Sequence, residues 1–130
     1  MNIVLDTTVL AKALVKPRRA KKDGIYDEQL RLHKIASSLI RDIESGRDVM
    51  YTPSIAVVEI ASVVSRLTGL EELGKEAAQF VSGLATSILY DFELLNESVS
   101  IAAKTKVSGF DIVFLACTKL TDSILITDDR

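Results

Sequence analysis

Short aliphatic runs that alternate with longer helical stretches constrain the fold of this chain more than any other feature. Short runs of apolar and β-branched residues predict strands at residues 2–6, 48–52, 90–95 and 123–127. Between successive strands, the spacing of apolar residues predicts two helices each time. Strands that alternate with helices need crossover connections, so we expect a mostly parallel sheet.

The predicted helices share apolar positions three or four residues apart, and Gly or Pro follows four of the six. They are expected at residues 7–14, 27–45, 53–67, 71–87, 96–107 and 110–120. Aromatic residues make up only 5% of the chain and Trp is absent, so aliphatic side chains must build the core. The 130 residues are enough for one such core. We therefore expect a single-domain three-layer α/β/α fold over residues 1–130.

Composition and charge exclude several classes of protein. A formal net charge of −2 and a pI near 5.4 exclude a strongly basic nucleic-acid binder, so contact with nucleic acid would need local basic patches or bound cations. The single cysteine, Cys117, excludes a disulfide scaffold and a cysteine-rich zinc site, and we expect it in the core. The lone histidine, His33, is expected on a solvated helix surface. Without a signal peptide or a membrane-spanning window, a cytoplasmic location is expected.

Acidic residues embedded in apolar sequence are the candidate functional residues. Asp6 ends the first strand, and Asp128 and Asp129 follow the last. Asp111 opens the helix before the last strand, and Glu59 lies early in another helix. The carboxyl ends of parallel strands form one edge, where ligands bind in such sheets. All these acids can therefore converge at that edge.

Each acid also has a purely structural interpretation. Asp6 could cap the helix that follows it, and Asp111 could be an N-cap or a first-turn acid stabilised by the helix dipole. Glu59 could face water beside Ser62 and Arg66, which share its side of the helix. The last two acids, at 128 and 129, could be a solvated chain end.

A shared metal ion would explain the acids together. Clustered carboxylates repel one another, and a divalent cation removes that repulsion. Ligands that are all oxygen atoms favour Mg²⁺ or Mn²⁺ over Zn²⁺. The sequence therefore predicts a magnesium or manganese site.

Four motifs in this order resemble the PIN domain, in particular the small toxin ribonucleases of the VapC type. They are LDTTVL with Asp6, PSIAVVEIASVVSR with Glu59, SGFDIVFLA with Asp111, and ITDDR with Asp129. The resemblance covers the whole chain. The Thr-x-Asp pattern of the last motif selects Asp129 and leaves Asp128 as a second candidate.

The resemblance implies hydrolysis of RNA phosphodiester bonds by a metal-activated water. It implies Asp6, Asp111 and Asp129 as metal ligands, Glu59 as a fourth catalytic acid, and supporting roles for Thr7, Thr8 and Thr127, which would orient carboxylates or contact phosphate. It also implies a homodimer and a small cognate antitoxin protein that inhibits the enzyme. The wide apolar arcs of the helices at 27–45 and 71–87 agree with an interface, although burial within one subunit would explain them too.

A basic run after the first helix is the candidate RNA-binding segment. Its alternative is a solvated loop, and it comprises Lys16, Arg18, Arg19, Lys21 and Lys22. Two other functions compete with a ribonuclease. One is a PIN fold kept only as a binding module. The other is a phospho-acceptor domain of the receiver type, but residues 90–95 end without the acceptor Asp that such a domain needs, and no Lys follows the last strand.

Overall fold

A computed structural model of the chain describes residues 1–107 and 109–128. Its strands and helices follow one another in the predicted order. They are β1 (Asn2–Leu5), α1 (Thr7–Leu14), α2 (Gly24–Glu44), β2 (Val49–Pro53), α3 (Ser54–Thr68), α4 (Glu71–Leu84), β3 (Ser87–Leu89), α5 (Asp91–Thr105), α6 (Asp111–Leu120) and β4 (Ile124–Ile126).

The four strands form one sheet in the order β3-β2-β1-β4, and every neighbouring pair is parallel. In the register of the central strand β1, Ile3 lies between Met50 of β2 and Ile124 of β4. The fully parallel sheet confirms the expected topology. It also puts the residue that follows β1 in the middle of the sheet's carboxyl edge.

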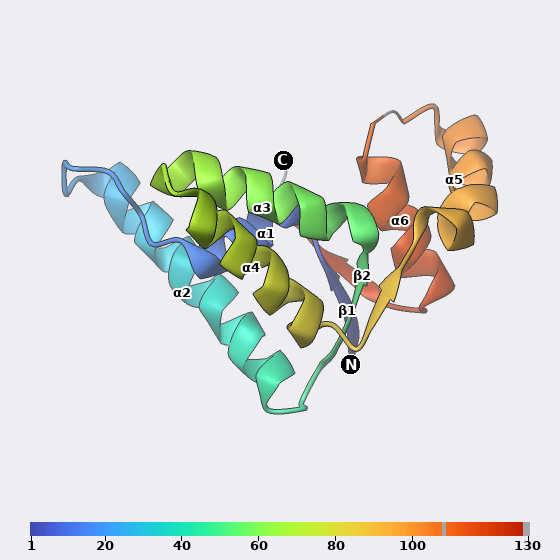
Figure 1. The fold of residues 1–130 in the computed structure, drawn as a ribbon, viewed down its shortest axis with the longest axis horizontal. Coiled ribbons are helices and arrows are strands. Elements are labelled where there is room, and N and C mark those ends of the chain that lie inside the picture. Colours follow the sequence, from blue (N-terminus) through green and yellow to red (C-terminus); the bar gives the residue numbers. More distant parts are fainter. Residues whose placement is uncertain (108, 129–130) are drawn as a thin grey trace.

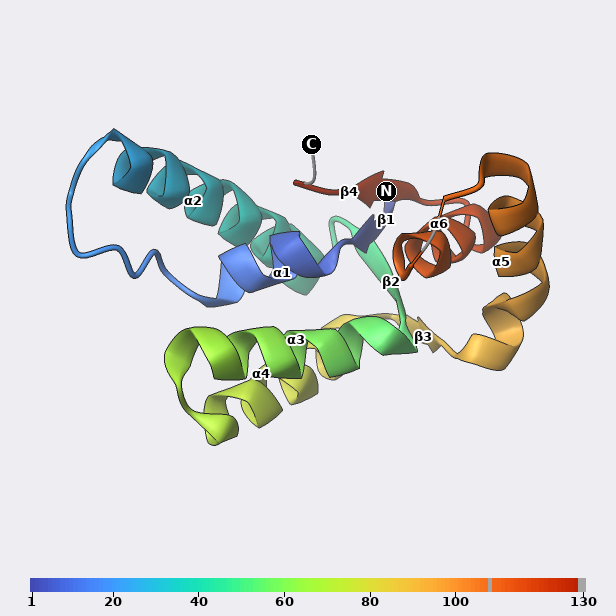
Figure 2. The same cartoon turned by 90° about the horizontal axis from the view of Figure 1, so that it is seen from above.

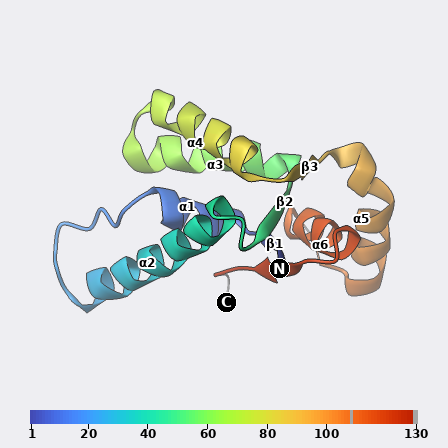
Figure 3. The same ribbon diagram turned by 90° about the horizontal axis from the view of Figure 1, so that it is seen from below.

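The helices cover both faces of the sheet, as Figures 1 and 2 show. Helices α1, α2, α3 and α4 lie on one side, and α5 and α6 lie on the other; Figure 3 shows the same division from below. The predicted three-layer α/β/α fold is therefore confirmed. No helix in the described part of the chain is both long and apolar enough to cross a membrane.

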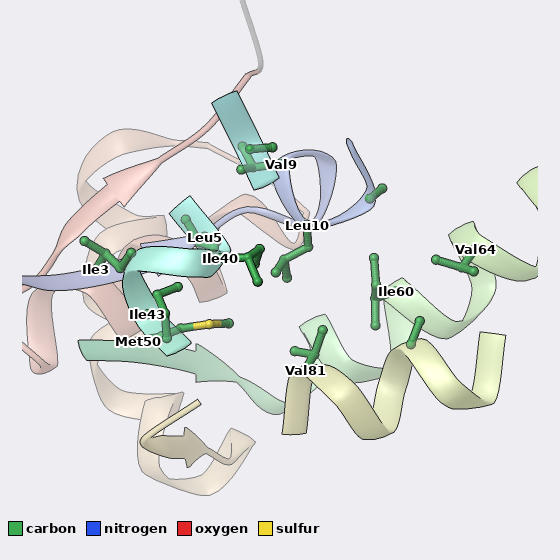
Figure 4. Close-up of a cluster of buried hydrophobic side chains, with 13 residues drawn as sticks. Ile3, Leu5, Val9, Leu10, Ile40, Ile43, Met50, Ile60, Val64 and Val81 are labelled. Atoms are coloured by element: carbon green, nitrogen blue, oxygen red, sulfur yellow. The ribbon is translucent and has the colours of Figure 1, made fainter. Parts of the chain in front are cut away.

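Alternating side chains of β1 supply both halves of the core. Ile3 and Leu5 point into a cluster with buried residues of α1 to α4, which Figure 4 shows. Val4, between them, packs in a second cluster with Phe114 and Cys117 of α6. Burial raises the pKa of the Cys117 thiol to about 12, with a smaller contribution from the nearby charge of Glu93. The expectation that this cysteine is a core residue is confirmed.

The strand predicted at residues 90–95 is wrong, because this segment begins helix α5 and the third strand is β3, just before it. The Tyr90 N–H donates to the Glu93 carboxylate at 2.7 Å, which satisfies a backbone donor at the helix start. Of the apolar residues here, Leu94 is buried while Phe92 and Leu95 are exposed. A run that looked like a buried strand therefore has only one side chain in the core.

Candidate active site

Asp6 joins three elements at the carboxyl edge of the sheet. Its backbone N–H donates to the Ile126 carbonyl of β4 at 3.0 Å. Its carboxylate accepts from the Thr8 N–H at 3.4 Å, so it caps α1, and from the Thr127 hydroxyl at 2.7 Å. The capping interpretation of Asp6 is thus correct. Capping leaves lone pairs on both carboxylate oxygens, because an ionised carboxylate accepts about four hydrogen bonds.

Glu59 is hydrogen-bonded to Thr7, the residue that follows Asp6 in the chain. It is half-buried on α3, and its carboxylate accepts from the Thr7 hydroxyl at 3.0 Å. Thr7 is only 7% exposed, so this hydrogen bond lies between packed helices. Ser62 and Arg66 are exposed, whereas Glu59 is only partly in contact with water, because one of its oxygens accepts the Thr7 hydrogen bond. Because Thr7 directly follows Asp6, its hydrogen bond holds a second carboxylate, that of Glu59, at the carboxyl edge of the sheet.

Asp111 is the first residue of α6, and Phe110 occupies the N-cap position. Asp111 is therefore a first-turn acid and not an N-cap, and the positive end of the helix dipole favours its charge. Its side chain is exposed, and within the described residues it forms no hydrogen bond or ion pair. Helix α6 begins on the side of the sheet toward which the strands point (Figure 1).

Asp128 is half-buried and forms an ion pair with Lys12 of α1. It is therefore not part of a solvated chain end. Lys12 is a basic residue at the site that sequence reasoning missed, because the ion pair joins opposite ends of the chain. Asp129, the acid that the last motif selects, lies outside the described residues, as does Arg130.

All the candidate ligands are carboxylates, and this donor chemistry suits Mg²⁺ or Mn²⁺. The carboxylate of Asp111 has no partner among residues 1–107 and 109–128, and that of Asp6 has acceptor capacity left. Within those residues, no three His, Cys, Asp or Glu side chains lie close enough together to hold a metal ion. The remaining candidate, Asp129, falls outside them.

The basic run forms the connection between α1 and α2, and part of it is already paired. Arg19 binds Asp23 through two hydrogen bonds of 3.0 and 2.8 Å. The Arg19 guanidinium, together with the Tyr26 N–H, lowers the pKa of the Asp23 carboxyl. The ammonium of Lys22 lies 3.9 Å from the centre of the Tyr26 ring.

Lys16 and Arg18 of this run form no ion pair within the described residues, and they line a cavity of about 600 Å³. The cavity lies between α1, the connection after it, α2 and α3, and it begins at Thr7 and Thr8 beside the acids. Sequence reasoning did not find it, because four separate segments form its walls.

His33, on α2, lines the same cavity and is half-buried, so the expectation of a solvated surface histidine is wrong. Its Nδ1 lies 2.6 Å from the Lys12 carbonyl oxygen. A carbonyl can only accept, so Nδ1 carries the proton and donates. This bond leaves Nε2 as the ring nitrogen that is available to a ligand.

Comparisons with known proteins identify the family and the fold of the chain. The family model for the PIN domain matches residues 3–130. Among solved structures, the chain is similar in fold to a chain of the VapBC2 complex of Rickettsia felis, which was crystallised bound to a DNA fragment from their promoter. The two chains are 16% identical, the TM-score is 0.55, and the match covers 99% of this chain and 88% of the other. A search of curated proteins gives no match. The family match extends over nearly the whole chain, and we conclude that this protein belongs to the PIN domain family.

Proposed function

We propose that this protein is a metal-dependent endoribonuclease and the toxin of a toxin–antitoxin pair. PIN domains are generally nucleases. The observation that carries the proposal is the hydrogen-bonded acid network, which we define as Asp6, Thr7, Glu59 and Thr127. It lies at the carboxyl edge of the sheet, where α/β proteins of this kind bind their ligands.

In this proposal Asp6, Asp111 and Asp129 hold Mg²⁺ or Mn²⁺, with Asp128 as the alternative to Asp129. The cation would neutralise charge on the scissile phosphate and lower the pKa of a bound water, which becomes the nucleophile. The chain's own contribution is orientation. The Thr127 hydroxyl and the Thr8 N–H each hold one oxygen of Asp6, so the remaining lone pairs are presented in defined directions.

Glu59 acts as the fourth acid and orients the attacking water through a hydrogen bond. The Thr7 hydroxyl donates a hydrogen bond to Oε1 of Glu59, which leaves Oε2 to orient the water. Because Thr7 is buried, its hydroxyl cannot turn to solvent, and it restricts the rotamers of Glu59.

The test is cleavage of a defined RNA by protein purified to homogeneity, with Mg²⁺ and with a chelator. Cleavage should require the cation, and Asp6→Asn or Asp111→Asn should lower it by roughly 100-fold or more while weakening cation binding in calorimetric titration. Asn also caps helices well, so Asp6→Asn should not unfold the protein, and Asp111 is an exposed first-turn residue whose replacement removes no packing contact. Asp91→Asn is the matched control, because Asp91 is an exposed acid in the same first position of α5.

Unchanged cleavage and unchanged cation binding in both Asp variants would refute the assignment of the site. A wild-type protein that binds RNA but cleaves none, with either cation, would instead make this chain a PIN-fold binding module.

The basic connection is proposed to bind the RNA backbone. Arg18 and Lys21 form no ion pair in the described part of the chain, whereas Arg19 is held by Asp23. Replacing Arg18, Arg19, Lys21 and Lys22 by Ala should weaken RNA binding and flatten its salt dependence, because fewer counterions are released. A salt slope identical to that of the wild type would make the run a solvated loop.

A homodimer is proposed as well, and exposed apolar side chains support it. On α2 and α4 only part of the apolar surface is buried within the subunit, because Ile25 and Ile35 of α2 are 55% and 47% exposed, and Leu73 and Phe80 of α4 are each 37% exposed. A more exposed set lies on α5, where Phe92 is 80% exposed and Leu95 and Val99 are each 60% exposed. Their spacing puts them on one side of that helix. Sedimentation equilibrium at micromolar concentration should give twice the chain mass, and a monomeric mass would refute the dimer.

A small antitoxin protein is the second proposed partner. The VapBC2 complex that resembles this fold contains two proteins, as its name says. In this chain a groove of about 350 Å³ between the end of α1, α3 and α4 offers Leu73 and Phe80 to a partner's apolar side chains. Purification from the native cell should recover a small bound protein, and its absence at native expression levels would remove this part of the proposal.

A further inference from the structure

The cavity beside the acid network has a composition unlike that of the chain as a whole. The chain carries a net charge of −2, yet the residues that line the cavity include four cations and no Asp or Glu. We propose that the cavity binds one nucleotide of the RNA strand, next to the phosphodiester that lies at the acids. This inference rests on the proposed function and extends it from the reaction to the recognition of the substrate.

The walls of the cavity suit a base and its ribose. Val63 and Leu67 of α3 form one apolar wall, and Val15 and Pro17 contribute from the end of α1 and the connection after it. The volume of about 600 Å³ lies in the usual range for small-ligand pockets. Apolar walls with a few convergent polar groups are what such ligands need.

The cations provide the phosphate contacts, and they differ in availability. Lys12 is paired with Asp128, and Arg19 is paired with Asp23. Lys16 and Arg18 have no ion pair within residues 1–107 and 109–128. An anionic group in the cavity would therefore be held mainly by these two side chains.

The inner end of the cavity contains a hydroxyl that lacks a partner. The Thr8 Oγ1 atom is buried and has no hydrogen-bond partner in the described part of the chain. Such a group is unfavourable unless something else satisfies it. Thr8 is two residues from Asp6 and lines the cavity, so a phosphate or ribose oxygen between the cavity and the acids would satisfy it. This position makes a nucleotide a better occupant than a peptide side chain.

The experiment is calorimetric titration of the purified protein with each of the four ribonucleoside 5′-monophosphates, in a chelator so that the metal site plays no part. At least one should bind, in the millimolar range or tighter. Leu67→Glu places an acid on the apolar wall and should weaken binding roughly ten-fold or more, and Lys16→Ala should weaken it roughly three- to ten-fold. Leu67 is 49% exposed, so the Glu variant should fold.

Val58→Glu is the matched control, because it makes the same change on the same helix at a residue that is 65% exposed and does not line the cavity. It should bind nucleotide as the wild type does. Thermal melting of each variant checks that it is folded. In the cleavage assay Leu67→Glu should raise KM for RNA more than it lowers kcat, because the acids are untouched.

Failure of the inference and failure of the proposed function are distinguishable. Metal-dependent RNA cleavage by a protein that binds none of the four nucleotides would overturn the inference alone. Nucleotide binding that Leu67→Glu weakens, in a protein that cleaves no RNA, would support the cavity assignment and overturn the proposed reaction. If Leu67→Glu leaves nucleotide and RNA binding unchanged but the protein loses a co-purifying small partner, the cavity is a polypeptide site and the inference is wrong.

Discussion

Replacing Thr7 by Val should lower the free energy of unfolding by about 1 to 2 kcal/mol. The side chain keeps its branched shape, so the main loss is the hydrogen bond of 3.0 Å to Glu59. Hydrogen bonds to charged groups contribute about 1.5–3 kcal/mol. Glu59 is only half-buried, so solvent replaces part of that interaction in the variant, which is why the lower part of the range applies.

The expected shift in Tm follows from the size of the chain. Globular proteins unfold with an entropy of about 2.1 cal/mol/K per residue, which for this chain gives about 0.27 kcal/mol/K. A loss of 1 to 2 kcal/mol therefore lowers Tm by about 4 to 7 °C. Thermal unfolding followed by circular dichroism, together with urea unfolding, would measure both quantities.

A double-mutant cycle isolates the hydrogen bond from other effects of the change. Thr7→Val and Glu59→Ala should be non-additive by about 1 kcal/mol, because each removes the same contact. Thr7→Val combined with Glu76→Ala, at an exposed residue of α4, should be additive within about 0.5 kcal/mol. Additive free energies for the Thr7–Glu59 pair would refute the claim that this bond joins α1 to α3.

Two further predictions concern the packing and the ionisation of the core. Gly74→Ala should destabilise the protein by about 1–2 kcal/mol, because the added Cβ would lie 2.5 Å from the Ala61 carbonyl oxygen. Gly83→Ala, in the same helix, meets no atom within 4 Å and should stabilise the protein by about 0.5–1 kcal/mol. Equal melting temperatures for the two variants would contradict the close contact of α3 and α4. The Cys117 thiol has a pKa of about 12 against an ordinary value of 9.0, so only the unfolded chain ionises between these values. The free energy of unfolding should therefore be insensitive to this group below pH 9 and fall as the pH rises toward 12, and pH titrations of unfolding should show a smaller fall for Cys117→Ala.

The order of the elements and the parallel sheet were predictable from the amino-acid sequence. Both follow from local signals, because apolar periodicity separates strands from helices and crossover connections favour parallel neighbours. Helix α1 begins right after Asp6 and ends where Pro17 approaches, and these limits could be read directly. The misassigned segment at residues 90–95 shows where such signals fail. Apolar residues in a short run do not reveal how many of them are buried, and only packing in the cluster with Val4 and residues of α6 decides that Leu94 is the buried one.

The candidate acids were also identifiable from sequence, because carboxylates in apolar surroundings are unusual for any chain. Asp6 was placed correctly at the edge of the sheet, as its position after a strand predicts. Its neighbours were not predictable in the same way. The hydrogen bond from Thr127 and the one between Thr7 and Glu59 join residues that are far apart in the chain.

Which charges are paired and where a cavity forms could be learned only from the folded chain. Lys12 and Asp128 meet because β4 lies beside β1, and no spacing rule connects positions at the two ends of a chain. Within the basic run, only the folded connection distinguishes Arg19, which is held by Asp23, from Arg18, which forms no ion pair within the described residues. The sequence determines which residue types are available. Their chemistry depends on distances and on burial, and these quantities exist only once separate segments have packed together.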